Sequence, residues 1–419
     1  MNIPSISFKY LKANPLNSTL NILILSLGIA IISILLLLSH QLEEKLSKNS
    51  KGLDLVIGAK GSPLQLVLCN LFHIDYPTGN ISLDEAQKLA SGPMIKKAIP
   101  LALGDSYQGF RIVGTNHAFA EHYTAKLANG SLWQTKMETC IGSLVAERLE
   151  LKIGDTFMGT HGIGDATGDA HEGAEYKIVG IFEKSNSVID NLIATSVESV
   201  WEVHEHEEEP HDHSHEDGHH HHHKEEEVAL TGLPKGDEES EITSLLVKFK
   251  SPMAAITMPR IINEQTNMQA ASPSFEIARL FSIMGVGVDF LSGFAYLMVF
   301  IAVLSIFISL YHALKERRYD LAVMRSLGSA RISLFLLVVS EGVLISLFSA
   351  IFGLSLAHII LELVGTYNAD AVKAGITGAL FLKEEVFLLG SSLLIGVFTA
   401  FIPAIQSYKT DITEVLAKG

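Results

Sequence analysis

The stretch "LNILILSLGIAIISILLLLS", residues 20–39, decides the fold class because it carries no charge over a length that matches a membrane. A hydrocarbon core about 30 Å thick is crossed by a helix of about 20 apolar residues. Two more runs without charge are Phe290–Leu314 and Val386–Tyr408, and Ile332–Leu361 carries only Glu341. The sequence therefore predicts four transmembrane helices.

The first apolar run is not expected to be a cleaved signal. It begins late, is long, and is followed by "SHQLEEKLSKNS" with no small-residue cleavage site. We expect it to stay in the membrane as an anchor.

Lysine and arginine in the short loops predict the orientation. Lys9 and Lys12 precede the first run, and Lys409 and Lys418 follow the last. The loop between the second and third runs holds the densest basic group: Lys315, Arg317, Arg318, Arg325 and Arg331. We therefore expect both termini and this loop to lie in the cytoplasm.

The expected layout is an α-helical membrane domain with a large mixed α+β extracytoplasmic domain between its first two helices. The segments are an amphipathic surface helix (1–17), a first transmembrane helix (18–39), the extracytoplasmic domain (40–283), a second transmembrane helix (284–314), a cytoplasmic coupling loop (315–331), a third transmembrane helix (332–362), a short external loop (363–385), a fourth transmembrane helix (386–408) and a cytoplasmic tail (409–419).

Short strand and helix patterns alternate through the extracytoplasmic segment. "DLVIGAKGSP", "FRIVGT", "YKIVGIF" and "SLLVKFK" read as strands. "SLDEAQKLA" reads as a helix that opens on a capping box of Ser82 and Glu85. The glycine-rich residues 159–173 read as an exposed loop.

Residues 204–241 are low in complexity and rich in histidine and acidic residues, and we expect them to be disordered. They hold most of the net charge of −15. The acidity therefore belongs to one loop, and it points to no nucleic-acid partner. Two cysteines, Cys69 and Cys140, do not make a disulfide framework, and whether they pair stays open.

The segment "KERRYDLAVMRSLGSARISLFLLVVSEGVLISL", residues 315–347, resembles the joint between the second and third membrane helices of MacB/FtsX-like ABC transporter permeases. Asp320 stands where the family usually has Glu. In the tail, Pro403, Ala404 and Glu414 match, and Asp411 replaces the usual proline. The residues of the 315–347 segment that match the family are Glu316, Arg317, Arg318, Leu321, Met324, Arg325, Leu327, Gly328, Ser329 and Glu341.

This resemblance implies a multi-pass protein of the bacterial cytoplasmic (inner) membrane that works as a permease dimer with cytoplasmic ABC ATPase subunits. ATP would bind to the partner, since the chain has no G-x-x-x-x-G-K-[ST] sequence. With no hydrolase motif either, we do not expect an enzyme. The family also implies mechanotransmission, in which ATP-driven closure moves the external domains, and it leaves room for a periplasmic or outer-membrane partner besides membrane lipids.

The coupling loop is the expected docking site for the ATPase. Leu321, Met324, Arg325 and Gly328 fall at i, i+3, i+4 and i+7, so they share one face of a helix, and such a face suits a groove on a partner. A second interpretation is that Arg317 and Arg318 only anchor the helix at the phosphate level. The predicted docking set is Glu316, Arg317, Arg318, Asp320, Leu321, Met324, Arg325, Leu327 and Gly328.

The histidine tract could bind Zn²⁺ or a similar divalent metal, since neutral imidazole is the commonest metal ligand of proteins. Three interpretations stay open: a metal-capturing or metal-sensing loop, a solvated insert with incidental affinity, and a purification tag. His161 and His171, in the glycine-rich loop, could contribute. No other cofactor is expected. The candidate metal ligands are His204, His206, His211, His213, His215, His219, His220, His221, His222 and His223.

Three functions compete at this point. The first is the permease subunit of a MacB/FtsX-type transporter, with metal-linked transport or export as one form of it. The second is an ATP-driven transmembrane signal transducer that regulates an external enzyme. The third is a membrane-anchored metal-binding protein that has no ATPase.

Overall fold

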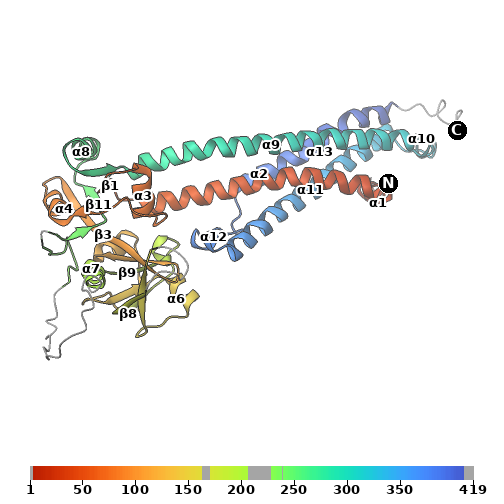
Figure 1. Ribbon diagram of the computed structural model, residues 1–419. Coiled ribbons are helices and arrows are strands. Elements are labelled where there is room, and N and C mark those ends of the chain that lie inside the picture. Colours follow the sequence, from red (N-terminus) through yellow and green to blue (C-terminus); the bar gives the residue numbers. More distant parts are fainter. Residues whose placement is uncertain (1–2, 163–169, 206–227, 238, 410–419) are drawn as a thin grey trace. The chain divides into compact units, whose positions relative to one another are not determined.

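The computed structural model describes residues 3–162, 170–205, 228–237 and 239–409, and the chain divides into two compact units. Residues 1–42 and 283–419 form a membrane unit, and residues 43–282 form an external domain. Among the described residues, four helices are long and apolar enough to cross a membrane (Figure 1). They are α2 (Pro15–Ser50), α9 (Pro273–Glu316), α11 (Arg331–Tyr367) and α13 (Lys383–Tyr408). The predicted fold class is thus confirmed.

The membrane unit is built around the close approach of α11 and α13. A Cβ atom on Gly342 would lie 2.6 Å from the carbonyl oxygen of Gly396, so both positions need glycine for the two backbones to meet. Small residues commonly allow such contacts between membrane helices, where van der Waals packing replaces the hydrophobic effect. Shorter helices complete the unit: α1 (Ile3–Ala13), α10 (Arg318–Ser326) and α12 (Ala369–Lys373). The chain breaks between α1 and α2, and Pro15 begins α2.

The external domain is organised by one mixed sheet of ten strands among its described residues, with β10 and β2 forming a separate pair. The main path runs β12-β1-β11-β3-β4-β9-β6-β8-β5, and β7 pairs with β3 and β8. The strands are β1 (Leu55–Ala59), β2 (Ile81–Ser82), β3 (Ile95–Tyr107), β4 (Phe110–Thr115), β5 (Leu127–Gly130), β6 (Glu138–Ile141), β7 (Thr156–His161), β8 (Ala170–Phe182), β9 (Leu192–Ser196), β10 (Glu241–Ile242), β11 (Ser244–Phe249) and β12 (Met268–Ala271).

The long strand β3 links two apolar cores. Its first half pairs with β11, beside a core that includes Leu55, Ile57 and Leu245. Its second half pairs with β4 and β7, beside a core that includes Ile141 and Tyr176. Helices cover the sheet and connect its strands: α3 (Pro63–Leu71), α4 (Leu83–Ala90), α5 (His117–His122), α6 (Ser143–Leu149), α7 (Val197–Glu205), α8 (Pro252–Gln265) and the 3₁₀ turn η1 (Val188–Asn191).

Several local expectations need correction. Helix α4 forms where predicted, but Ser82 makes no side-chain capping bond. Residues 159–161 and 170–173, expected in an exposed loop, extend β7 and β8 instead. Cys69 and Cys140, whose pairing the sequence left open, are buried free thiols.

Part of the segment 204–241, which was predicted to be disordered, has a defined structure. His204 belongs to α7, and residues 206–227 lie outside the described residues. After them the chain packs on the domain: Ala229 donates its N–H to Glu198 Oε1 over 2.8 Å, and Asn116 Nδ2 donates to the carbonyl oxygen of Gly232 over 2.6 Å. These bonds satisfy backbone groups that low-complexity composition alone would leave to water.

Candidate functional site

The predicted coupling loop folds as helix α10, which ends at a glycine turn. Gly328 has φ +100°, a left-handed conformation that costs glycine little. Its N–H bonds the carbonyl oxygen of Arg325, and the N–H of Ser329 bonds that of Met324 over 3.1 Å. A Cβ at Gly328 would meet no atom within 4 Å, so backbone conformation alone demands glycine there. This turn redirects the chain into α11 at Arg331.

One side of α10 is buried inside the membrane unit. Leu321 is 2% exposed and Ala322 fully buried. Leu321 belongs to an apolar cluster with Leu334 of α11, and Met324 packs against the same cluster. The structure therefore corrects which face is accessible: Leu321 holds α10 to its own chain and presents no apolar surface to a partner.

The accessible side of α10 is polar with two large apolar side chains. Leu327 is 83% exposed and Tyr319 53% exposed. Most of the remaining predicted docking residues are exposed, and Arg317, Arg325 and Met324 are partly buried. The exposed members of the predicted set are Glu316, Arg318, Asp320, Leu327 and Gly328.

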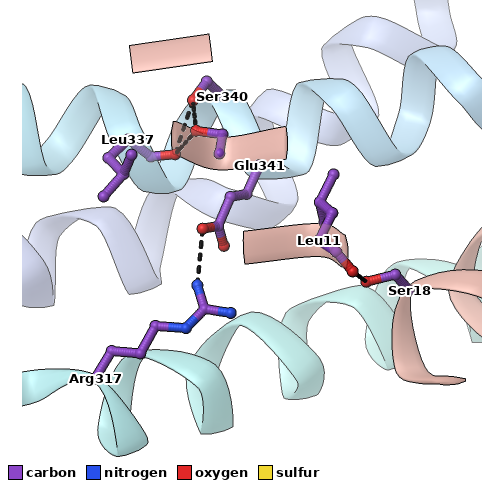
Figure 2. A network of polar contacts seen from close by, with 7 residues as sticks. Leu11, Ser18, Arg317, Leu337, Ser340 and Glu341 are labelled. Atoms are coloured by element: carbon purple, nitrogen blue, oxygen red, sulfur yellow. Dashed lines mark hydrogen bonds and ion pairs between the residues drawn. The ribbon is translucent and has the colours of Figure 1, made fainter. Parts of the chain in front are cut away.

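A charged pair at the base of α10 ties three helices together. Arg317 Nη1 lies 2.9 Å from Glu341 Oε1 of α11, and both side chains are largely buried (Figure 2). The guanidinium also lies over the ring of Tyr10 in α1, 4.0 Å from its centroid, in a cation–π contact. A carboxylate inside a membrane helix is costly without a partner, and Arg317 is that partner.

Helix α1 is bound to α11 by hydroxyl contacts as well. The buried Ser7 donates to the carbonyl oxygen of Leu337 over 3.1 Å and contacts the Ser340 hydroxyl, which bonds Leu337 in turn. Figure 2 shows this group and the bond from Ser18 to Leu11 at the corner between α1 and α2. Within this unit α1 is therefore a packed element, and Tyr10 faces Arg317.

A second polar cluster lies within the membrane unit, and the sequence did not predict it. Glu385 of α13 is buried; its carboxylate accepts from Ser33 Oγ over 2.6 Å and from the Leu382 N–H. His358 Nε2 lies 3.1 Å from Glu385 Oε1. Glu362, four residues after His358 in the sequence, accepts from Thr377 Oγ1 over 2.9 Å. The one feature of the sequence that could have indicated this cluster is that Glu385 directly precedes the apolar run Val386–Tyr408.

In the external domain, the structure describes only one of the ten histidines predicted to bind metal. His204 lies in the last turn of α7, and the other nine lie outside the described residues. His204 is brought beside His161 of β7, with ring centroids 5.1 Å apart, and beside Asp105 of β3. The sequence did not indicate Asp105 as a metal ligand, because it lies within an ordinary strand and no histidine, cysteine or acidic residue adjoins it.

Two family models match the chain. The model described as MacB-like periplasmic core domain matches residues 18–254, and the model described as FtsX-like permease C-terminal matches residues 292–412. No curated protein matches the sequence.

Solved structures of external domains are also similar to part of the chain. The periplasmic region of MacB from Actinobacillus actinomycetemcomitans is 10% identical, with a TM-score of 0.34 over 57% of this chain and 96% of that one. The extracellular domain of the noncanonic ABC-type transporter YknZ from Gram-positive bacteria is 9% identical, with a TM-score of 0.30 over 52% of this chain and 98% of that one.

Proposed function

Because the chain belongs to the MacB/FtsX-like permease family, we propose that it is the membrane subunit of an ABC system in which a separate ATPase moves the external domain. The observation that supports this most directly is the anchoring of α10. A force applied to this short helix would pass through Arg317 to α11 and α1, since Glu341 and Tyr10 hold the guanidinium from two sides.

The continuous helix α9 supports a lever action. It runs without interruption from Pro273, two residues after β12, to Glu316 at the start of α10. At 1.5 Å per residue its 44 residues span about 66 Å. The helix thus begins close in sequence to a strand of the external sheet and ends next to the proposed docking helix. Displacement of α10 is therefore expected to reach the external sheet.

The proposal places residues 315–331 and both termini in the cytoplasm of a bacterium, with residues 43–282 on the other side of the inner membrane. It rests on the bias of lysine and arginine toward these segments. The ATPase would contact the accessible side of α10, where Arg318, Tyr319 and Leu327 lie. Two permease copies would complete the assembly with two ATPase subunits, as the family resemblance implies.

Co-purification from native membranes tests this proposal. We expect an ABC ATPase to accompany the wild-type chain, and Leu327→Asp to abolish its retention. Tyr367→Asp is the matched control, because Tyr367 is equally exposed, at 83%, but ends α11 at the opposite end from α10. Retention of the ATPase by Leu327→Asp together with Arg318→Glu would contradict docking at α10. Absence of any ATPase from the wild-type preparation would contradict the coupling proposal itself.

A further inference from the structure

Three side chains of the external domain converge on one point. Asp105 comes from β3, His161 from β7 and His204 from α7, and one ligand atom of each lies within 4.8 Å of the others. His161 Nδ1 is 3.3 Å from Asp105 Oδ1, and His204 Nε2 is 3.5 Å from Asp105 Oδ2. These residues lie far apart in the sequence, so the sheet and α7 alone bring them together.

The backbone holds two of the three ligands in register. Asp105 and His161 are cross-strand partners in the antiparallel pair β3–β7. Beside them, the N–H of Gly162 bonds the carbonyl oxygen of Gly104 over 2.9 Å. Directly opposed residues of a strand pair have Cβ atoms about 4.5–5.5 Å apart, which lets two side chains share one ligand. His204 completes the group from the last turn of α7.

The distances match those between ligands of a tetrahedral metal site. With bonds of about 2.0–2.1 Å to nitrogen and oxygen, neighbouring ligand atoms in a tetrahedron lie about 3.3 Å apart. The two histidine–carboxylate distances, 3.3 Å to Oδ1 and 3.5 Å to Oδ2 of Asp105, are close to this value, and the three ligand atoms as a set lie within 4.8 Å of one another. Two imidazoles and one carboxylate are also a ligand set that Zn²⁺ uses in proteins, with water in the fourth position.

Burial and charge favour a cation at this point. The Asp105 side chain is 1% exposed, whereas those of His161 and His204 are 43% and 40% exposed. The carboxylate is therefore the shielded base of the site, and the two imidazoles form its open side, which leaves a path for an ion and for water.

We propose that Asp105, His161 and His204 form a three-ligand site for Zn²⁺ or a divalent cation of similar preference. This site goes beyond the proposed coupling function and does not depend on an ATPase. Bound metal would join the end of α7 to the β3–β7 pair, at the base of the segment that carries the other tract histidines. The site thus differs from loose binding along the tract: it has fixed geometry and takes one ion.

The experiment uses the full chain in detergent, with the nine tract histidines from His206 to His223 replaced by asparagine so that only the proposed site is measured. Zn²⁺ alone is added as the probe. Its binding is measured by titration calorimetry, and the ligands of the bound metal are identified by X-ray absorption. We expect one equivalent of Zn²⁺, with nitrogen and oxygen ligands that include two imidazoles. His161→Gln, His204→Gln and Asp105→Asn should each weaken binding by at least about 100-fold, more than the loss of an outer-shell contact causes.

His312→Gln is the control, since His312 is exposed on α9 and belongs to no such cluster among the described residues. It should leave zinc binding unchanged. Because His161 and His204 are well exposed, their glutamine variants are expected to fold even if Asp105→Asn does not. The proposal is overturned if the nine-histidine variant binds no zinc, or if both glutamine variants bind it as tightly as their parent. Neither result bears on ATPase retention, so either proposal can be refuted while the other stands.

Discussion

Arg317 Nη1 lies 2.9 Å from the carboxylate of Glu341, and this contact joins the start of the proposed docking helix to the first third of the membrane helix α11. Glu341 is the only charged residue in the apolar run Ile332–Leu361. Its position is explained by its partner, because a buried charge persists where an opposite charge and hydrogen bonds compensate for lost hydration.

The first prediction concerns this pair. Arg317→Ala should leave the Glu341 carboxylate buried without its partner and destabilise the membrane unit by about 3–5 kcal/mol. The double variant Arg317→Ala with Glu341→Ala should recover much of that loss but not the coupling of ATP hydrolysis. Thermal unfolding in detergent and ATPase stimulation are the two measurements. The exposed pair Arg260–Glu264 is the control, where Arg260→Ala should cost less than about 1 kcal/mol. If Arg317→Ala and Arg260→Ala were equally stable, this account would be contradicted.

The second prediction separates packing from docking on α10. Leu321→Ala should destabilise the membrane unit by about 2–5 kcal/mol, since Leu321 is buried in an apolar cluster. Leu327→Ala should leave stability within about 0.5 kcal/mol of wild type, because Leu327 is exposed. Unfolding midpoints of the two variants provide the comparison. A neutral Leu321→Ala would show that this side of α10 is free, as the sequence alone had suggested.

The third prediction uses two glycines of opposite character. Gly328→Ala should destabilise the turn after α10 by about 1 kcal/mol or more, because its φ of +100° strains any residue with a Cβ. Gly285→Ala should instead stabilise α9 by up to about 1 kcal/mol, since Gly285 lies within that helix and its Cβ would meet no atom within 4 Å. Opposite shifts in the unfolding midpoint are expected; shifts of the same sign would refute the assignment of the turn.

The fourth prediction is a pH dependence at His73 of the external domain. Burial, with a smaller contribution from Arg111, holds the pKa of His73 well below its usual value. The unfolded chain then binds a proton more readily, so the stabilisation from neutral His73 is complete above about pH 6.5 and falls as the pH drops toward the folded pKa. His73→Asn should reduce this acid sensitivity. Asparagine tolerates the φ of +56° at this position, which keeps the backbone comparable.

Unfolding midpoints of wild type and His73→Asn at about pH 7.5 and about pH 5.5 measure the effect, since the ordinary histidine pKa lies between these values. The wild type should lose more stability over this interval than the variant. An identical loss in both proteins would remove His73 as a source of the pH dependence.

The fifth prediction concerns orientation. Cysteine at the exposed Lys235 of the external domain should react with a membrane-impermeant thiol reagent in intact spheroplasts, whereas cysteine at the exposed Ser326 of α10 should react only after lysis. The natural thiols add little background because both are buried, and burial raises the pKa of Cys140 to about 12. The reverse labelling pattern would invert the proposed topology.

The sequence by itself determined the helices of the membrane unit, since an uncharged run of about 20 residues matches the membrane thickness whatever its neighbours are. It also determined four strands of the external domain, as for "FRIVGT" in β4, because local apolar patterning reports burial directly. The joint at residues 315–347 pointed to the family for a similar reason: the glycine turn and the charges that flank it are local features.

Only the tertiary structure decided which faces and which partners these elements have. Leu321 and Met324 lie on one side of a helix in the sequence, but the pattern does not say whether that side meets a partner protein or the chain itself. A buried Glu341 implies a cationic partner, but the sequence offers several arginines in the loop, and only the fold shows that Arg317 forms the ion pair. The carboxylate of Asp105 meets His161 because of strand register and His204 because of the position of α7. Such contacts depend on how distant segments pack, and side-chain spacing along one segment carries no information about that.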